Sequence, residues 1–176
     1  QASQLQTIAR SMSGKPQINA VYAIATPALQ AVAKWEVKRP VVFAAVSDPS
    51  QIVKGSAPHS SQIMGVTDQS DAEGQTELIR RLLPTAKRIC ILYNPGEANS
   101  QASIAAYEPA LKKHGMSLQK KGVYQAAEIS AAIYAAKRSC DALLVPTDNL
   151  VVSAMPLVAK KSLEVNLPLI VSDENS

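Results

Sequence analysis

The sequence of 176 residues is poor in aromatic side chains, with one tryptophan, one phenylalanine and five tyrosines. Alanine, valine, leucine and isoleucine therefore supply the predicted core, and the hydrophobic content of 47% favours a packed chain over a disordered one. The formal net charge is only +4, and the basic residues are dispersed as pairs near predicted helix ends. Nucleic-acid binding needs cations gathered on one face with stacking aromatics, so we expect no nucleic-acid partner.

The sequence also lacks the short motifs of common catalytic and nucleotide-binding sites. It contains no GxGxxG, no GxxxxGK[ST], no GxSxG and no HExxH. No stretch approaches the ~20 apolar residues of a membrane-spanning helix. The two cysteines, Cys90 and Cys140, have no histidine near them in the sequence, so buried thiols are favoured over a metal site, and a disulfide stays open. We predict no catalytic residue, no cofactor and no metal.

What is present is an alternation of short apolar runs and helical patterns. The runs predict strands at 18–25, 41–46, 63–66, 89–93, 117–124, 142–145 and 169–171. Helical spacing predicts helices at 2–12, 26–35, 72–83, 100–113, 128–138 and 150–163. Strands that alternate with helices are typical of right-handed βαβ units, so the predicted class is α/β with parallel sheets.

A polar break divides this pattern. Residues 50–62, SQIVKGSAPHSSQ, are the least periodic part of the chain and indicate two sheets rather than one. We therefore predict part of a first lobe at 1–62, with only two strands, and a second lobe at 63–171. Residues 172–176 are predicted to begin a return to the first lobe. A flavodoxin-like single lobe is the alternative.

Small polar residues follow most of the predicted strands. They are Thr26-Pro27, Ser47-Asp48, Asn94-Pro95, Thr147-Asp148-Asn149 and Ser172-Asp173. In open α/β sheets this carboxyl edge is where ligands bind. Helix capping explains part of the pattern. A small zwitterion needs the same groups, because hydroxyls and helix N–H groups hold a carboxylate and an acidic side chain holds an ammonium.

Five segments carry a resemblance that covers nearly the whole chain. They are VYAIATPALQAVA, RPVVFAAVSDP, MGVTD at 64–68, LLPTAKRICILYNPGEANS and DALLVPTDNLVVSA. Together they resemble the substrate-binding proteins of an ABC-transporter family, some of which look like receptors for aromatic, tryptophan-type amino acids. The resemblance implies a type I periplasmic-binding-protein fold, in which two Rossmann-like lobes trap a solute by hinge closure.

The same resemblance implies a function without covalent chemistry. An amino-acid-like solute would be bound and delivered to an ABC permease in the membrane, so no enzyme activity is expected. The resemblance also implies export with a signal peptide, to the periplasm or to a lipid anchor outside the cell membrane. Family members carry a strand before the position of Gln1 and return to the first lobe after Ser176, so the first lobe is expected to be incomplete here.

The positions that match the family supply the predicted ligand-binding residues. In the first lobe they are Thr26, Pro27 and Ala28, which open a helix toward the ligand carboxylate, with Ser47 and Asp48 on the neighbouring turn. In the second lobe they are Asn94, Glu97, Asn99, Ser100, Thr147, Asp148 and Asn149. Asp148 is the predicted partner of the ligand ammonium, and Asp173 is predicted to be a ligand or hinge residue.

Two other functions stay open from sequence. The sensing domain of a transcription regulator shares this fold, and would need a helix-turn-helix segment upstream of Gln1. A doubly wound hydrolase could act through Asp148, and would turn over the bound solute.

Overall fold

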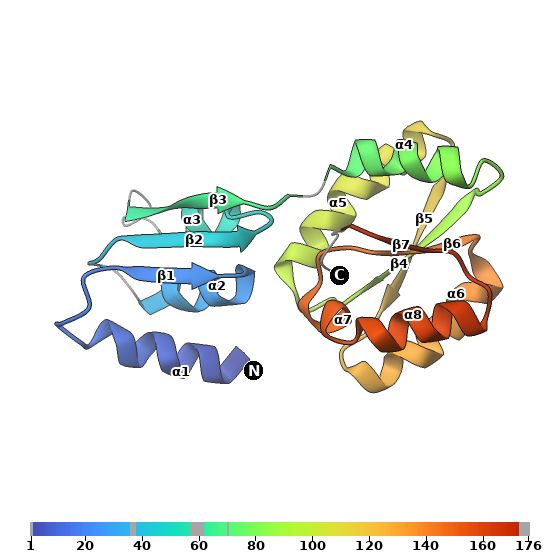
Figure 1. Ribbon diagram of the computed structural model, residues 1–176. Coiled ribbons are helices and arrows are strands. Elements are labelled where there is room, and N and C mark those ends of the chain that lie inside the picture. The colour runs from blue at the N-terminus through green and yellow to red at the C-terminus, as the bar shows by residue number, and fades with distance from the viewer. Residues whose placement is uncertain (1, 36–37, 57–61, 70, 173–176) are drawn as a thin grey trace. The chain divides into compact units, whose positions relative to one another are not determined.

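The computed structural model describes residues 2–35, 38–56, 62–69 and 71–172. It divides into two compact units, residues 1–69 (unit 1) and 70–176 (unit 2). Each unit contains a parallel sheet with helices packed on it, as the sequence predicted (Figure 1). Within the described ranges, no helix combines the length and apolar character needed to cross a membrane.

Unit 1 contains a three-stranded parallel sheet in the order β1-β2-β3. Its elements are α1 (Ala2–Ser13), β1 (Val21–Ile24), α2 (Thr26–Trp35), β2 (Val41–Val46), α3 (Ser50–Gly55) and β3 (Ile63–Thr67). One core joins the sheet to its helices, with Leu29 of α2 fully buried and Ala9 of α1 nearly so. This burial of apolar surface is the main force that holds unit 1 together.

The predicted boundary after residue 62 is wrong. Strand β3 pairs with β2 through Val41 and Ile63, so it belongs to unit 1, and the chain leaves this unit near Gln69. The polar stretch that suggested a boundary contains α3 and stands in the sequence between two neighbouring strands of one sheet. Such connections are polar because their backbone faces water, and polarity alone does not distinguish them from a linker.

The sheet of unit 1 buries only one of its faces in the described structure. Val21 and Ala23 point into the core, whereas Tyr22 and Ile24 alternate with them and are 61% and 60% exposed. Met64 and Val66 of β3 are also exposed. The continuous apolar character of these strands had predicted a sheet covered on both faces, and the described residues cover only one.

Unit 2 contains a four-stranded parallel sheet in the order β5-β4-β6-β7. Its strands are β4 (Arg88–Tyr93), β5 (Ser117–Gly122), β6 (Ala142–Val145) and β7 (Leu169–Val171). Its helices are α4 (Ala72–Leu82), α5 (Ala98–Lys113), the 3-10 turn η2 (Ala126–Glu128), α6 (Ile129–Ser139), α7 (Asn149–Ser153) and α8 (Met155–Glu164). The edge position predicted for β5 is confirmed.

Two hydrophobic cores flank the sheet of unit 2. Helices α4 and α5 cover one face and α6, α7 and α8 the other, as Figure 1 shows. Successive side chains of β4 pack into opposite cores: Ile91 packs on the α5 side and Leu92 on the α6 side. Both are fully buried, as expected for a central strand of a parallel sheet.

Two helices of unit 2 differ from their predicted form. The single helix expected over 150–163 is two helices separated at Ala154, because Pro156 lies at the start of α8 and favours a new first turn. Helix α5, by contrast, is continuous through Pro109. The sequence pattern had suggested an interruption there.

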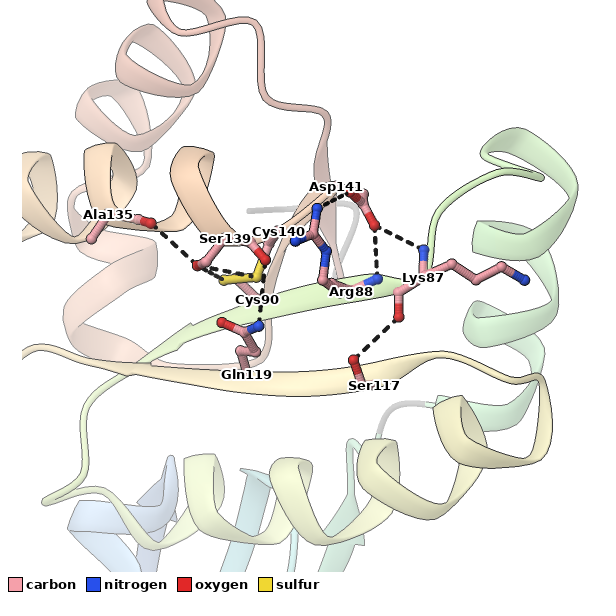
Figure 2. The surroundings of a disulfide bond; sticks show 9 residues. All are labelled: Lys87, Arg88, Cys90, Ser117, Gln119, Ala135, Ser139, Cys140 and Asp141. Atoms are coloured by element: carbon pink, nitrogen blue, oxygen red, sulfur yellow. Dashed lines mark hydrogen bonds and ion pairs between the residues drawn. A yellow bond between two sulfur atoms is a disulfide. The ribbon is translucent and has the colours of Figure 1, made fainter.

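Cys90 and Cys140 form a disulfide in unit 2, so the interpretation as thiols is wrong although their predicted burial is confirmed. The bond joins the middle of β4 to the residue that follows α6 (Figure 2). The Ser139 hydroxyl lies 3.8 Å from each sulfur and donates a hydrogen bond to the carbonyl of Ala135. The disulfide therefore fixes helix α6 to the central strand from inside the core.

A carboxylate next to the disulfide ties the start of β4 to the start of β6. Asp141 accepts hydrogen bonds from the N–H groups of Lys87 and Arg88 at 2.9 and 2.8 Å, and from the Arg88 guanidinium at 3.0 Å (Figure 2). The guanidinium and these N–H groups lower the pKa of Asp141 from 3.8 to about 2. The folded state therefore favours the ionised carboxylate.

We predict that Asp141→Asn lowers the free energy of unfolding by about 1–2 kcal/mol at pH 7, after allowance for solvent screening. Because the folded pKa is depressed, this stabilisation is present above the unfolded pKa of 3.8 and is lost as the pH falls toward 2. Urea unfolding of both proteins at pH 7 and at about pH 2.5 measures the effect. An equal difference at the two pH values would contradict the prediction.

Candidate functional site

The carboxyl edge of the unit 1 sheet begins with a strained turn. Ala25, between β1 and α2, has φ 72°, and its N–H donates to the carbonyl of Ala44. Ala45 near the end of β2 has φ 54°, where the pairing of β2 with β3 shifts register. Left-handed alanine costs about 1–2 kcal/mol per residue, and such strain occurs preferentially at ligand sites.

The predicted polar residues of unit 1 directly follow Ala25 and lie close after Ala45. Thr26 is the first residue of α2 and is 2% exposed, so Ala25 rather than Thr26 precedes the helix. The carbonyl of Ala25 accepts the N–H groups of Ala28 and Leu29. The register shift places Ser47 beyond the end of β2, where it is 5% exposed. Thr26, Pro27 and Ala28 thus form the first turn of a ten-residue helix at the carboxyl edge of the sheet.

Two carboxylates stand beside Ser47. The Ser47 hydroxyl donates to Asp68 at 3.3 Å, and Asp48 accepts from the N–H of Ser50 at 2.9 Å. Hydrogen bonds from the hydroxyl and N–H of Ser50 lower the pKa of Asp48 below its usual value. Asp68 follows β3 and was not among the predicted site residues. Like the predicted site residues, Asp68 is a polar residue at a strand end. The sequence-based boundary after residue 62, however, assigned Asp68 to the second lobe.

In unit 2, Asp148 is fully buried and joins two loops. Its Oδ2 atom accepts hydrogen bonds from the N–H of Asn94 at 2.6 Å and from the Ser100 hydroxyl at 2.5 Å. Its Oδ1 atom accepts from the N–H of Val151 at 2.9 Å and so caps α7. Both carboxylate oxygens are thus used within unit 2. The β4–α5 loop and the β6–α7 loop are held together because β4 and β6 are neighbouring strands.

Glu97, in the β4–α5 loop, binds the start of α7, just as Asp148 binds the β4–α5 loop. It precedes α5 but does not cap it; its carboxylate instead accepts hydrogen bonds from the N–H groups of Asn149 at 3.0 Å and Leu150 at 3.2 Å. Together with the contact of Asp148 to Val151, these bonds satisfy the first three N–H groups of α7. Each loop therefore provides a carboxylate to the other, and α7 keeps no free first-turn N–H for a ligand.

Side-chain amides surround the partly exposed Glu97 carboxylate. Asn149 donates through Nδ2 at 2.7 Å, and Asn94 and Asn99 donate at 3.4 and 3.3 Å. Asn99 also donates to the carbonyl of Thr147 at 2.6 Å, while its Oδ1 atom is buried without a partner. Glu97 thus receives three side-chain amides besides two backbone N–H groups, and side-chain amides can rotate without movement of the backbone. Asp148 receives two backbone N–H groups and one buried hydroxyl, so fewer of its partners can move.

Burial raises the pKa of Asp148 above its usual value, although the hydrogen bonds from Ser100, Asn94 and Val151 act in the opposite direction. The nearby Glu97 carboxylate also raises it. A carboxyl whose pKa is higher in the folded than in the unfolded state stabilises the fold fully below its unfolded pKa. This stabilisation is lost as the pH rises through the folded pKa. The hydrogen bonds from Ser100, Asn94 and Val151 favour the ionised form of Asp148 and oppose the effect of burial.

The structure brings the predicted residues together as two sets. Thr26, Pro27, Ala28, Ser47 and Asp48 lie at the strand ends of unit 1, and Asn94, Glu97, Asn99, Ser100, Thr147, Asp148 and Asn149 lie at the strand ends of unit 2. Asp173 lies outside the described residues. Within the described ranges, no group of three or more His, Cys, Asp or Glu side chains could hold a metal ion. The polar groups offer hydrogen bonds and negative charge, as needed for a small polar ligand.

Comparison with known proteins gives a consistent result. A family model described as "ABC transporter substrate binding protein" matches residues 1–176. The tyrosine-binding protein of Clostridioides difficile (strain R20291) is 35% identical over 158 residues, which are 89% of this chain and 46% of that protein. The chain thus spans about half the length of this curated relative.

Solved structures match the same region. A conserved domain protein from Vibrio cholerae has a TM-score of 0.90 and 28% identity, with 99% of this chain and 60% of that chain covered. An ABC domain from Streptococcus pneumonia in complex with L-Trp has a TM-score of 0.89 and 27% identity, with the same coverage. Both are longer than the chain described above.

Proposed function

This chain belongs to the ABC transporter substrate-binding protein family, and from that membership we propose that it is the ligand-binding part of a receptor that supplies an ABC importer. Its α/β architecture is that of the type I periplasmic binding proteins, as predicted. The observation that carries the proposal is the set of polar residues at the carboxyl edge of each parallel sheet, where α/β proteins bind small molecules. The receptor delivers its solute to a membrane permease.

The ligand is an amino acid with an aromatic side chain. One relative is named for tyrosine binding, and one structural neighbour holds L-Trp. On unit 1, the start of α2 at Thr26, Pro27 and Ala28 offers an anionic group the Thr26 hydroxyl and the positive end of the helix dipole, since Pro27 has no N–H and the N–H groups of Ala28 and Leu29 bond the Ala25 carbonyl. The first turn of α7 is unsuited to this role because Glu97 and Asp148 already occupy its N–H groups.

Glu97 is the carboxylate that meets the ligand ammonium. This assignment replaces the sequence-based choice of Asp148, whose side chain is fully buried. Glu97 is partly exposed, and of the amides that surround it those of Asn94 and Asn149 can turn toward a ligand, whereas the buried Asn99 also donates to the Thr147 carbonyl. Ser47 and Asp48 of unit 1 supply further polar contacts.

Binding without chemical change is sufficient for this role. A micromolar dissociation constant corresponds to about 8 kcal/mol. A few charge-assisted hydrogen bonds and one buried aromatic ring supply that amount. The Ser100 hydroxyl donates to the Asp148 carboxylate, but both side chains are fully buried, so this pair offers a ligand no exposed nucleophile.

The disulfide supports a location outside the cytoplasm. Disulfides form and persist in oxidising compartments such as the periplasm and the cell surface. Cys90 and Cys140 are bonded and buried in the core of unit 2. The protein therefore folds in an oxidising compartment, where receptors of ABC importers meet their solutes.

We predict that the purified protein binds L-tyrosine or L-tryptophan with a micromolar dissociation constant and releases it unchanged. Isothermal titration calorimetry with these two amino acids, and with leucine and glutamate as controls, measures the affinity and the preference for aromatic side chains. Mass spectrometry of the solute after long incubation tests for turnover. Absence of binding to any amino acid would contradict the proposed function, and a modified solute would indicate a hydrolase.

A further inference from the structure

The two acidic residues at the carboxyl edge of unit 2 look equivalent in sequence, since each immediately precedes a helix. Their surroundings differ. Asp148 has no exposed surface and receives two backbone N–H groups and one buried hydroxyl, whereas Glu97 is partly exposed and receives three side-chain amides besides two N–H groups. One carboxylate is fixed and the other is adaptable.

The contacts of Asp148 fix the conformation of the β4–α5 loop. A single oxygen, Oδ2, binds the first residue of that loop through the N–H of Asn94 and the third residue of α5 through the Ser100 hydroxyl. Glu97 lies between these two attachment points. Its own contacts to Asn149 and Leu150 cross back to the loop that carries Asp148. Asp148 therefore fixes the backbone on both sides of Glu97, and so contributes to the position of its carboxylate.

From this geometry we propose that Asp148 is a positioning residue that does not touch the ligand, and that it holds Glu97 ready for the ligand ammonium. The proposal deepens the proposed function and rests on it for the role of Glu97. The role of Asp148 in the loop rests only on contacts within unit 2. The charged group that faces Asp148 is Glu97, which comes from the start of α5. Its other partners are two N–H groups and a hydroxyl.

Asp148→Asn separates positioning from direct contact. Asparagine keeps the size of the side chain but loses the acceptor for the N–H of Asn94. We expect amide hydrogen exchange at Asn94, in the ligand-free protein, to become about 10- to 100-fold faster, as expected for loss of a hydrogen bond to a charged acceptor. Ser100→Ala, which removes only the hydroxyl, should give a smaller increase. Ser103→Ala is the matched control, because Ser103 lies one turn further along α5 and bonds Asn99 instead.

Ligand binding provides the second measurement. Calorimetry compares L-tyrosine with 3-(4-hydroxyphenyl)propanoate, which lacks the ammonium group. Because Asp148 acts through Glu97, which meets only the ammonium, Asp148→Asn should weaken L-tyrosine about tenfold and the ammonium-free compound little. In a Glu97→Gln background, Asp148→Asn should cause no further loss of affinity for L-tyrosine, whereas loss of a direct partner of the ammonium would weaken it further.

The outcomes decide the proposal. Faster exchange at Asn94, together with no further loss of L-tyrosine affinity in the Glu97→Gln background, supports it. Unchanged exchange at Asn94, or a further loss of about tenfold in that background, overturns it. If the wild-type protein binds neither compound, the proposed function fails, and the exchange measurement alone decides whether Asp148 positions the loop.

Discussion

Removal of the disulfide by the double substitution Cys90→Ala and Cys140→Ala should lower the free energy of unfolding by about 4 kcal/mol. The bond joins residues separated by 50 positions, and release of a loop of that length increases the entropy of the unfolded chain. A loss of this size corresponds to a decrease in Tm of roughly 10–25 °C for a unit of this size. Urea and thermal unfolding of the wild-type and double-variant proteins measure it.

The wild-type protein supplies the control for the change in side chains. Both cysteines are buried in the core, at 0% and 5% exposure, so reductant alone should leave the bond intact under native conditions. Reductant added with urea should reduce it and shift the unfolding midpoint to that of the double variant. Two free thiols in the native protein would show that the bond has not formed. Equal unfolding midpoints for the oxidised protein and the double variant would show that the bond does not stabilise unit 2.

Glu97→Gln should reduce the affinity for L-tyrosine by about 100-fold, because removal of one partner of a desolvated charge pair costs about 2–5 kcal/mol. The N–H groups of Asn149 and Leu150 bond different oxygens of Glu97, so glutamine keeps an acceptor for only one of them, and the free energy of unfolding should fall by about 1 kcal/mol. Calorimetry with L-tyrosine measures the loss. The same titration with 3-(4-hydroxyphenyl)propanoate should show little loss, since that compound has no ammonium for Glu97 to bind.

Glu108→Gln is the matched control for this prediction. Glu108 lies on α5, the helix that Glu97 precedes; it is 56% exposed and forms an ion pair with Lys120 at 3.2 Å. Its substitution makes the same change in net charge away from the strand ends and should leave affinity unchanged. Equal affinities of the Glu97 variant and the wild-type protein would exclude Glu97 as the ammonium partner. Asp48 of unit 1 would then be the next carboxylate to test.

The sequence by itself determined the class of fold and the edge at which polar residues gather. Helix and strand periodicity is a local property, so the alternation of apolar runs and helical patterns predicted nearly every element in the correct order. Asn94 and Asp148 were recognised because polar residues at strand ends are also local signals. The resemblance to substrate-binding proteins rested on segments such as YNPGEANS, and the family is confirmed.

Only the tertiary structure decided which of these residues meet, because contacts between distant segments leave no local signal. The pairing of β3 with β2 moved the unit boundary to Gln69. The bond between Cys90 and Cys140 depends on the packing of α6 against β4. Asp148 and Glu97 differ in burial because neighbouring strands bring their loops together across about 50 residues of chain, and burial determines whether a carboxylate supports a loop or remains able to bind a ligand.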